Sequence, residues 1–260
     1  MEQKGAPAYI AELLGTFVLV VFIGLVVSIS SKGGLGYTDW AVIGLVHAFV
    51  LALLVAALAG ASGAHFNPAV TTTLLALKKI RGADAGIYIL MQLAGATLAA
   101  LFVKGLVLDE GRPVNWGATL LGKSFLQDNK FAGFAAEGIG TFALLLAICG
   151  AAVVVRNRSD ITAWVIGGAL GMAVMCIGPL TGAGLNPARA FGPMLVAGVL
   201  DNNFGTFLIV YTLGPIIGGL IAGLAIRFIY SNDLEEAEGI VPPREDVIEI
   251  ETDTPPGAPA

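Results

Sequence analysis

Two asparagines at the ends of glycine-rich loops are the residues of this sequence best placed to do chemistry. One begins the triplet Asn67-Pro68-Ala69, and the other begins Asn186-Pro187-Ala188. Asparagine caps helix N-termini, and proline fits the first helical position, where no amide hydrogen is needed. Each triplet is therefore expected to start a short helix, one over residues 69–77 and one over 188–199. Such helices cannot cross a bilayer, which takes ~20 apolar residues.

The chemistry expected of these stretches is hydrogen bonding around a positive centre. Asparagine amides donate hydrogen bonds, and helix N-termini carry partial positive charge, so two helix starts brought together would donate to oxygen and repel cations. Loop carbonyls inside a membrane are costly unless they face water, so the loops before the triplets are expected to offer acceptors. The expected acceptor carbonyls belong to Gly63, Ala64, His65, Gly182, Ala183 and Gly184.

The composition indicates a chain that crosses a membrane several times. Of 260 residues, 56% are hydrophobic and 13% charged, whereas a soluble domain is about 25% charged. Long apolar stretches occur at residues 8–30, 39–58, 84–107, 131–154, 161–178 and 204–229. Because a backbone in hydrocarbon must satisfy its own hydrogen bonds, these stretches predict helices. The expected fold is an all-α membrane protein with six transmembrane helices and two re-entrant half-helices.

The two halves of the chain form an internal repeat. Glu12 and Glu137 stand in similar segments 125 residues apart, and the Asn-Pro-Ala triplets are 119 residues apart. Each half has three spans, an odd number, so the second copy is expected to be inverted in the membrane. We place repeat one at residues 8–108 and repeat two at 131–230. Inverted repeats of this kind place their sites at the repeat interface near the bilayer midplane.

The membrane domain is expected to cover residues 1–230, followed by a tail over 231–260. The tail is rich in proline and holds nine acidic residues and one base, a composition that predicts disorder. Basic residues in short loops stay in the cytoplasm, so we expect both termini in the cytoplasm and the protein in the cell membrane as a multi-pass protein. The loop bases on the side of the tail are Lys78, Lys79, Arg81, Arg156 and Arg158, against Lys32, Arg112, Lys123 and Lys130 on the other side.

No enzyme is indicated by the sequence. It offers no nucleophile–base pair, metal-ligand cluster or phosphate-binding loop, so we expect no cofactor, no metal and no nucleic-acid partner. The cysteines, Cys149 and Cys176, lie in apolar stretches and are expected in the core. A secondary transporter is an alternative, because inverted repeats also build carriers. Glu12 and Glu137 are its only candidate intramembrane acids, and their matching placement favours hydrogen bonds to the two loops instead.

Taken together, these features resemble the aquaporin (major intrinsic protein) family. The resemblance extends over residues 8–229 and includes both triplets, the paired glutamates and the segment 186–193 with Arg189. It implies a passive channel that conducts water in single file and excludes protons and ions. It also implies a homotetramer in the lipid bilayer. The two asparagines would donate to a passing water, which interrupts a proton wire.

The resemblance further implies a selectivity filter of four residues. Its positions fall on His47, Val174, Ala183 and Arg189, and an arginine inside a membrane is itself a candidate functional residue. The set differs from the usual water-specific pattern and resembles a branch found in plant vacuolar membranes, whose filters are associated with water plus ammonia or other small neutral solutes. A glycerol facilitator is the alternative. Against it, Ala190 and Met194 stand where glycerol-conducting relatives carry an aspartate and a base.

Overall fold

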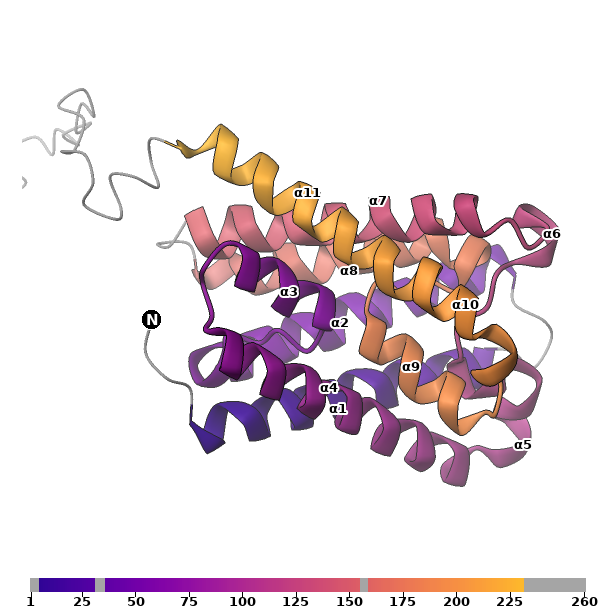
Figure 1. Cartoon of the computed structure of the whole chain (residues 1–260). Helices are drawn as coiled ribbons and strands as arrows, with labels where there is room; N and C mark the ends of the chain where they lie inside the picture. The colour runs from indigo at the N-terminus through magenta and orange to yellow at the C-terminus, as the bar shows by residue number, and fades with distance from the viewer. Residues whose placement is uncertain (1–4, 31–35, 155–158, 232–260) are drawn as a thin grey trace, which may run out of the picture.

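Six helical spans long and apolar enough to cross a membrane make up most of the structure, a computed structural model that describes residues 5–30, 36–154 and 159–231 (Figure 1). Their main helices are α1 (Ala6–Ser30), α2 (Tyr37–Ser62), α4 (Gly82–Leu106), α7 (Lys130–Ile148), α8 (Ser159–Thr181) and α11 (Gly214–Ile229). A π-helical segment, η3 (Cys149–Val154), continues α7. The sixth span starts with η4 (Asp201–Asn203), α10 (Phe204–Thr206) and the π-helical η5 (Phe207–Leu213). Lys32, Arg156, Arg158 and the predicted tail beyond Ser231 lie outside the described residues.

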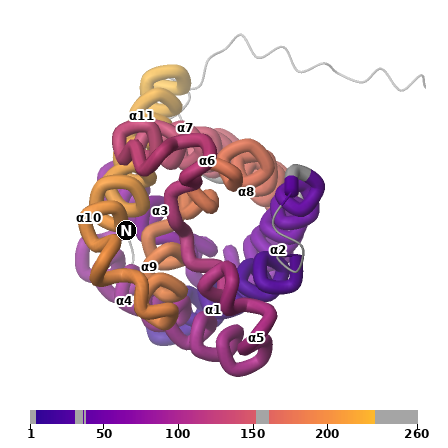
Figure 2. The backbone as a smooth tube through the Cα atoms, turned by 90° about the vertical axis from the view of Figure 1, so that its right-hand side faces the viewer, coloured from indigo at the N-terminus to yellow at the C-terminus, as the bar shows by residue number. Residues whose placement is uncertain are grey.

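Two half-helices, α3 (Pro68–Ala76) and α9 (Pro187–Val196), complete the two inverted three-helix repeats. Viewed along the bundle, the spans form a ring with the half-helices within it (Figure 2). In Figure 1, α3 runs from the centre toward the end where the chain begins, which we call the terminus side. The other half-helix, α9, runs toward the opposite end, which we call the long-loop side. The connection between the repeats lies there and forms α5 (Leu108–Gly111), the 3₁₀ turn η2 (Arg112–Gly117) and α6 (Lys123–Leu126).

Three predicted helix ends differ from the structure by three or four residues, and local capping explains them. The fifth span continues to Thr181 instead of residue 178, and Gly182 follows it with φ 78°. The second span continues to Ser62 instead of ending at residue 58. Gly63 stops it with a left-handed φ of 91° and donates its N–H to the carbonyl of Ala59. Conversely, α9 ends at Val196 instead of residue 199, because Gly198 turns the chain with φ 72°. Glycine adopts this conformation without the steric penalty that other residues incur.

Glycines let the spans approach one another closely. A methyl group on Gly95 of α4 would collide with the carbonyl oxygen of Leu13 in α1. In the other repeat, the same addition to Gly218 of α11 would collide with the carbonyl oxygen of Gly138 in α7. Small residues permit this backbone contact in membrane helices. The prediction that both cysteines lie in the core was wrong for Cys176, because it stands on the outward face of α8 and is exposed.

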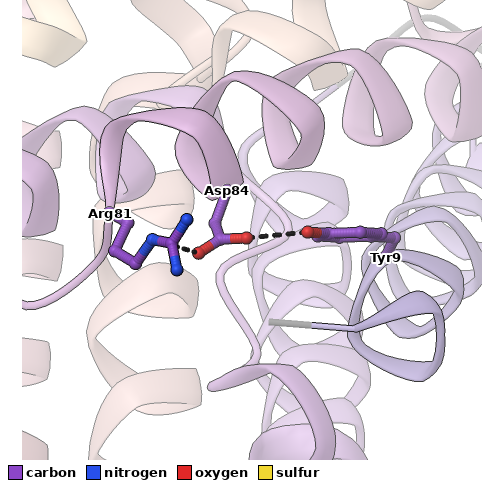
Figure 3. A network of polar contacts seen from close by, with 3 residues as sticks. All are labelled: Tyr9, Arg81 and Asp84. Atoms are coloured by element: carbon purple, nitrogen blue, oxygen red, sulfur yellow. Dashed lines mark hydrogen bonds and ion pairs between the residues drawn. The ribbon is translucent and has the colours of Figure 1, made fainter. Parts of the chain in front are cut away.

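A polar network ties α1 to the start of α4 on the terminus side (Figure 3). The hydroxyl of Tyr9 donates to Oδ1 of Asp84 at 2.7 Å, and Nε of Arg81 lies 3.6 Å from Oδ2 of the same carboxylate. The Tyr9 ring also contacts Tyr88 edge-on, and Tyr88 in turn contacts the ring of His65. This network therefore extends from the surface of the bundle to the loop before α3.

Candidate functional site

The two half-helices begin at asparagines whose side chains cap them. Oδ1 of Asn67 accepts a hydrogen bond from the backbone N–H of Ala69 at 2.8 Å. In the second half, Oδ1 of Asn186 accepts from the N–H groups of Ala188 and Arg189 at 3.0 and 3.2 Å. A proline follows each asparagine at the first helical position. Because backbone donors hold both Oδ1 atoms, the Nδ2 groups are left to donate elsewhere.

The half-helices are joined by a reciprocal exchange of hydrogen bonds. Nδ2 of Asn67 donates to the carbonyl of Leu185 at 2.9 Å, and Nδ2 of Asn186 donates to the carbonyl of Phe66 at 2.8 Å. An Nδ2 group carries two hydrogens, and the second hydrogen of each has no acceptor within residues 5–30, 36–154 and 159–231. The two predicted triplets therefore meet, and each asparagine keeps one free donor.

The loops before the half-helices share an unusual backbone. In the first loop, Gly63, Ala64 and Phe66 have φ angles of 91°, 53° and 47°. The second loop repeats the pattern, with φ of 78° at Gly182, 47° at Ala183 and 52° at Leu185. A non-glycine residue in this region costs roughly 1–2 kcal/mol, so other contacts must hold the loops. Among the described residues, no hydrogen bond ends on the carbonyls of Gly63, Ala64, Gly182, Ala183 or Gly184.

The buried carboxylate of Glu12 holds the first loop from α1. Its Oε1 accepts from the hydroxyl of Ser62 at 2.6 Å and from the N–H of His65 at 3.0 Å. Its Oε2 accepts from the N–H of Phe66 and from Nε2 of Gln92, each at 2.7 Å. Four hydrogen bonds satisfy a buried carboxylate that would otherwise be costly, and two of them fix the loop backbone directly.

Glu137 holds the second loop in the same way. Its Oε1 accepts from the hydroxyl of Thr181 and from the N–H of Gly184 at 2.8 Å, and its Oε2 accepts from the N–H of Leu185. The fourth donor is missing, because proline stands at position 215, where the repeat register would place the counterpart of Gln92. The second anchor therefore has three hydrogen bonds where the first has four.

A pair of tyrosines 123 residues apart supports both loops. Tyr88 donates its hydroxyl to the carbonyl of Ser62 at 2.8 Å, and Tyr211 donates to the carbonyl of Thr181 at 2.7 Å. Both rings are fully buried. Neither this pair nor Gln92 was predicted to support the loops, although the 123-residue repeat offset between α4 and the sixth span relates the two tyrosines.

A cavity of about 110 Å³ is lined by residues of this arrangement. A single water needs roughly 10–15 Å³ of such space, so several waters fit. Of the predicted site residues, those that line it are His47, Gly63, Ala64, His65, Asn67, Gly184, Asn186 and Arg189. Apart from Thr162, the rest of its wall is apolar and includes Leu19 and Leu144, which are related by the repeat offset of 125 residues. The cavity thus has a polar stripe and an apolar remainder.

His47 and Arg189 are two of the four predicted filter residues, and both line this cavity. Nδ1 of His47 lies 2.8 Å from the carbonyl of Ile43. In the neutral ring this bond places the proton on Nδ1 and leaves Nε2 as an acceptor, and Nε2 is buried without a hydrogen-bond partner among the described residues. Nη1 of Arg189 donates to the carbonyl of Gly117 at 2.7 Å. These two predicted filter positions therefore bring an acceptor and a cationic donor to one cavity.

Val174 and Ala183, the other two predicted filter residues, are fully buried and belong to the apolar cluster that also contains Ile43. They are not among the residues that line the cavity, and neither is Gly182.

The family model for the major intrinsic protein family matches residues 2–226. The chain belongs to the major intrinsic protein family. Members of this family are channels, and the six apolar spans make this chain an integral, multi-pass membrane protein.

Relatives of this family member carry different names. Aquaporin AqpM of Methanothermobacter thermautotrophicus is 35% identical over 85% of this chain and 96% of its own. Glycerol uptake facilitator protein-like 6 of Lactiplantibacillus plantarum is 39% identical over 86% of this chain and 99% of its own. Among solved structures, an aquaglyceroporin from Plasmodium falciparum has a TM-score of 0.69 at 24% identity and covers 90% of this chain and 99% of its own. That likeness supports the aquaporin fold.

Two residues of this family member that contact the site directly were also missed. Thr71 in α3 accepts from Nε2 of Gln92 at 3.0 Å and lies 3.1 Å from Nδ1 of His65. Gly117 supplies the carbonyl that holds Arg189, and it lies in η2, in the connection between the two repeats. Neither belongs to a motif, and their roles depend on which segments meet in three dimensions.

Proposed function

We propose that the protein is a passive channel that conducts water in single file and excludes protons and ions. The observation that carries this proposal is the reciprocal exchange between Asn67 and Asn186 and the loops across the join. The exchange leaves one amide hydrogen of each asparagine without an acceptor among the described residues, and both asparagines line the cavity. Two such donors suit the single oxygen of a water molecule.

Proton exclusion follows from how a water would bind there. A water oxygen that accepts from both asparagines has no lone pair left for a neighbouring water. The chain of hydrogen bonds along the file is therefore interrupted at this point, and a proton cannot be relayed through it. The N-terminus of each half-helix also lies at this point and carries about +0.5 of an elementary charge. Arg189 adds a full positive charge beside the cavity, so hydronium and other cations are repelled.

Conduction also needs weak binding along the path. Gly63, Ala64 and Gly184, whose carbonyls accept no hydrogen bond among the described residues, line the cavity together with apolar residues such as Leu51 and Leu170. An apolar wall makes no hydrogen bonds, so a water is held at few points and can move on. This division suits passage of a small neutral molecule better than tight binding of one.

Ammonia and other small neutral solutes are the further permeants that we propose. Nε2 of His47 supplies an acceptor in the filter, which an N–H or O–H group of a solute can satisfy. Valine stands at position 174, where the usual water-specific pattern has histidine. Arg189 is therefore the other polar side chain of the four predicted filter positions.

Glycerol is the alternative main permeant, and one relative supports it by name. Against it, Ala190 and Met194 are fully buried in an apolar cluster with Tyr211, where a charged pair would be needed to follow the glycerol-conducting pattern. A secondary transporter is less well supported. Its candidate acids, Glu12 and Glu137, are each occupied by loop hydrogen bonds.

The test is stopped-flow light scattering on vesicles that hold the purified protein. An osmotic step should shrink them faster than empty vesicles, with a proton conductance no higher than that of the lipid. Inward gradients of ammonia, urea and glycerol on the same vesicles rank the solutes. A glycerol permeability that exceeds the water permeability would favour the facilitator, and solute uptake that saturates and couples to an ion gradient would favour a carrier.

We further propose a homotetramer in the cell membrane with both termini in the cytoplasm. Lys78, Lys79 and Arg81 lie on the terminus side, in keeping with the preference of basic loops for the cytoplasm. Protease accessibility of an N-terminal tag in sealed cells tests the orientation. The mass of the detergent-solubilised particle, measured by light scattering, tests the tetramer.

A further inference from the structure

The guanidinium of Arg189 depends on a single protein acceptor. Among the described residues its one hydrogen bond runs from Nη1 to the carbonyl of Gly117, and Nε is buried without a hydrogen-bond partner. The side chain is otherwise enclosed, with only 3% of its surface exposed. Whatever sets the position of the Gly117 carbonyl therefore sets the position of the filter arginine.

That carbonyl belongs to a backbone segment in an uncommon conformation. Asn115, Trp116 and Gly117 have φ angles of 51°, 51° and 85° in succession. Left-handed backbone is disfavoured for asparagine and more so for a bulky aromatic residue. Two consecutive non-glycine residues in this conformation, Asn115 and Trp116, persist only where surrounding contacts enforce them.

The contacts that enforce this conformation centre on Trp116. Its indole Nε1 donates to the carbonyl of Val107 at 3.2 Å, and its ring packs so closely on Gly111 that a methyl group there would collide with it. The ring also belongs to the apolar cluster that contains Ala188, the residue before the filter arginine. Trp116 is buried although it lies in a connection between spans.

Lys104 links this tryptophan to the far end of the half-helix. Its Nζ lies 4.6 Å above the centre of the Trp116 ring and donates at 2.9 Å to the carbonyl of Val196, the last residue of α9. The helix that carries Arg189 is therefore held at its start through Gly117 and at its end through Lys104. Trp116 contacts both supports.

We propose that Trp116 and Lys104 are positioning residues for the proposed selectivity filter, because they fix the Gly117 carbonyl and α9 and so keep Arg189 in its position beside the cavity. This inference rests on the proposed channel function. Neither residue touches the permeant. Their removal should widen the range of solutes that pass without removing the central asparagine site.

The experiment compares Trp116→Phe and Lys104→Met with Trp164→Phe in the same vesicles. Trp164 stands on the outer face of α8, where 60% of its surface is exposed, so it controls for loss of an indole. The readout is the ratio of glycerol to water permeability, because loss of folded protein lowers both rates together and leaves their ratio unchanged. We expect the ratio to rise about threefold to tenfold for the first two variants, the scale of one hydrogen bond, and to stay constant for the control.

Gly117→Ala tests the carbonyl itself and has a matched control. A methyl group at Gly117 would stand 3.1 Å from the Cα of Gly24, whereas Gly198, which also has positive φ, has open space around it. Gly117→Ala should raise the ratio and Gly198→Ala should not. In an Arg189→Ala background, Trp116→Phe should produce no further rise, because its effect passes through the arginine.

Hydrogen exchange provides a readout that does not depend on conduction. The N–H of Ala118 donates to the carbonyl of Asn115 and closes the turn. Exchange over residues 112–122 should accelerate in Trp116→Phe. If exchange accelerates in Trp116→Phe while vesicles with the wild-type protein are no more permeable to water than empty ones, the channel proposal fails, but Trp116 still stabilises the turn at residues 112–117. If Trp116→Phe conducts water with an unchanged glycerol-to-water permeability ratio and unchanged hydrogen exchange over residues 112–122, the positioning role is overturned and the channel proposal stands.

Discussion

Asn67 donates its side-chain amide across the molecule to the carbonyl oxygen of Leu185 at 2.9 Å, while its own Oδ1 caps α3. Asn67→Asp keeps the cap but replaces the donor with an oxygen that faces the Leu185 carbonyl. We expect a loss of about 1–3 kcal/mol in the free energy of unfolding and a large fall in osmotic permeability. Thermal unfolding in detergent and stopped-flow shrinkage measure the two effects.

A matched control for that substitution is available in α7. Asn129 caps its helix in the same manner but is exposed, and it accepts from the N–H groups of Phe131 and Ala132. Asn129→Asp should leave stability and permeability near wild type. Equal behaviour of the two variants would show that the donation to Leu185 has no special role.

The carboxylate anchors should not tolerate an amide. In Glu137→Gln, an NH₂ group must replace one oxygen and face the donors that now bind there, the hydroxyl of Thr181 and N–H groups of Gly184 and Leu185. We expect about 1–3 kcal/mol of destabilisation, the cost of buried unsatisfied donors. Asp201→Asn, at an exposed site, should change stability by no more than about 0.5 kcal/mol. A Glu137→Gln protein as stable as wild type would contradict the anchoring role.

His47→Phe should narrow the range of permeants. The change removes the Nε2 acceptor and fills part of the cavity that His47 lines. Ammonia and urea permeability should fall by about tenfold relative to water, as expected for a lost hydrogen bond of ~1.4 kcal/mol. Parallel solute and osmotic steps on one vesicle preparation measure the ratio. An unchanged ranking of solutes would remove His47 from the filter.

Mercury should inhibit the wild-type protein weakly. Alanine stands at position 183, Cys149 is buried, and Cys176 is exposed on the outer face of α8. Ala183→Cys should introduce a strong block of water permeation that a thiol reductant reverses, because it places a thiol at a predicted filter position. Strong inhibition of wild type that persists in Cys176→Ser would point to Cys149 and against this assignment.

A close glycine contact between α11 and α7 gives a stability test. Gly218→Ala forces a methyl group against the carbonyl of Gly138, whereas a methyl group on Gly168 in α8 meets no atom within 4 Å. Gly218→Ala should destabilise the protein by about 1–3 kcal/mol, the usual cost of overpacking. Gly168→Ala should be neutral or slightly stabilising, because alanine is the better helix former. The midpoints of thermal unfolding in detergent compare the two.

The sequence predicts those parts of the fold that depend on length and local chemistry. Apolar stretches long enough to span predict the six helices, and Asn-Pro pairs predict the starts of α3 and α9. Helix ends are harder to predict from the sequence, because a single glycine with left-handed backbone can determine where a helix stops. Gly63 extends α2 past its predicted end and Gly198 shortens α9.

Within the site, sequence reasoning identifies residues that are repeated or that stand in a motif. The hydrogen bonds that Glu12 and Glu137 accept from the loops match their symmetric placement. Gln92 and Gly117 could not be found in this way. Gln92 has a proline in the matching position of the second half, and Gly117 acts through its backbone, which carries no side-chain signal.

The exchange of amide and carbonyl groups across the centre makes each half of the polypeptide an essential component of the other. A half-length chain would present an asparagine with no carbonyl to receive its hydrogen and a carbonyl with no amide to satisfy it. Two copies of one half, related by a rotation axis in the plane of the bilayer, could supply these groups to each other. The covalent link between the halves therefore secures, at any protein concentration, an association that separate halves would have to form by collision.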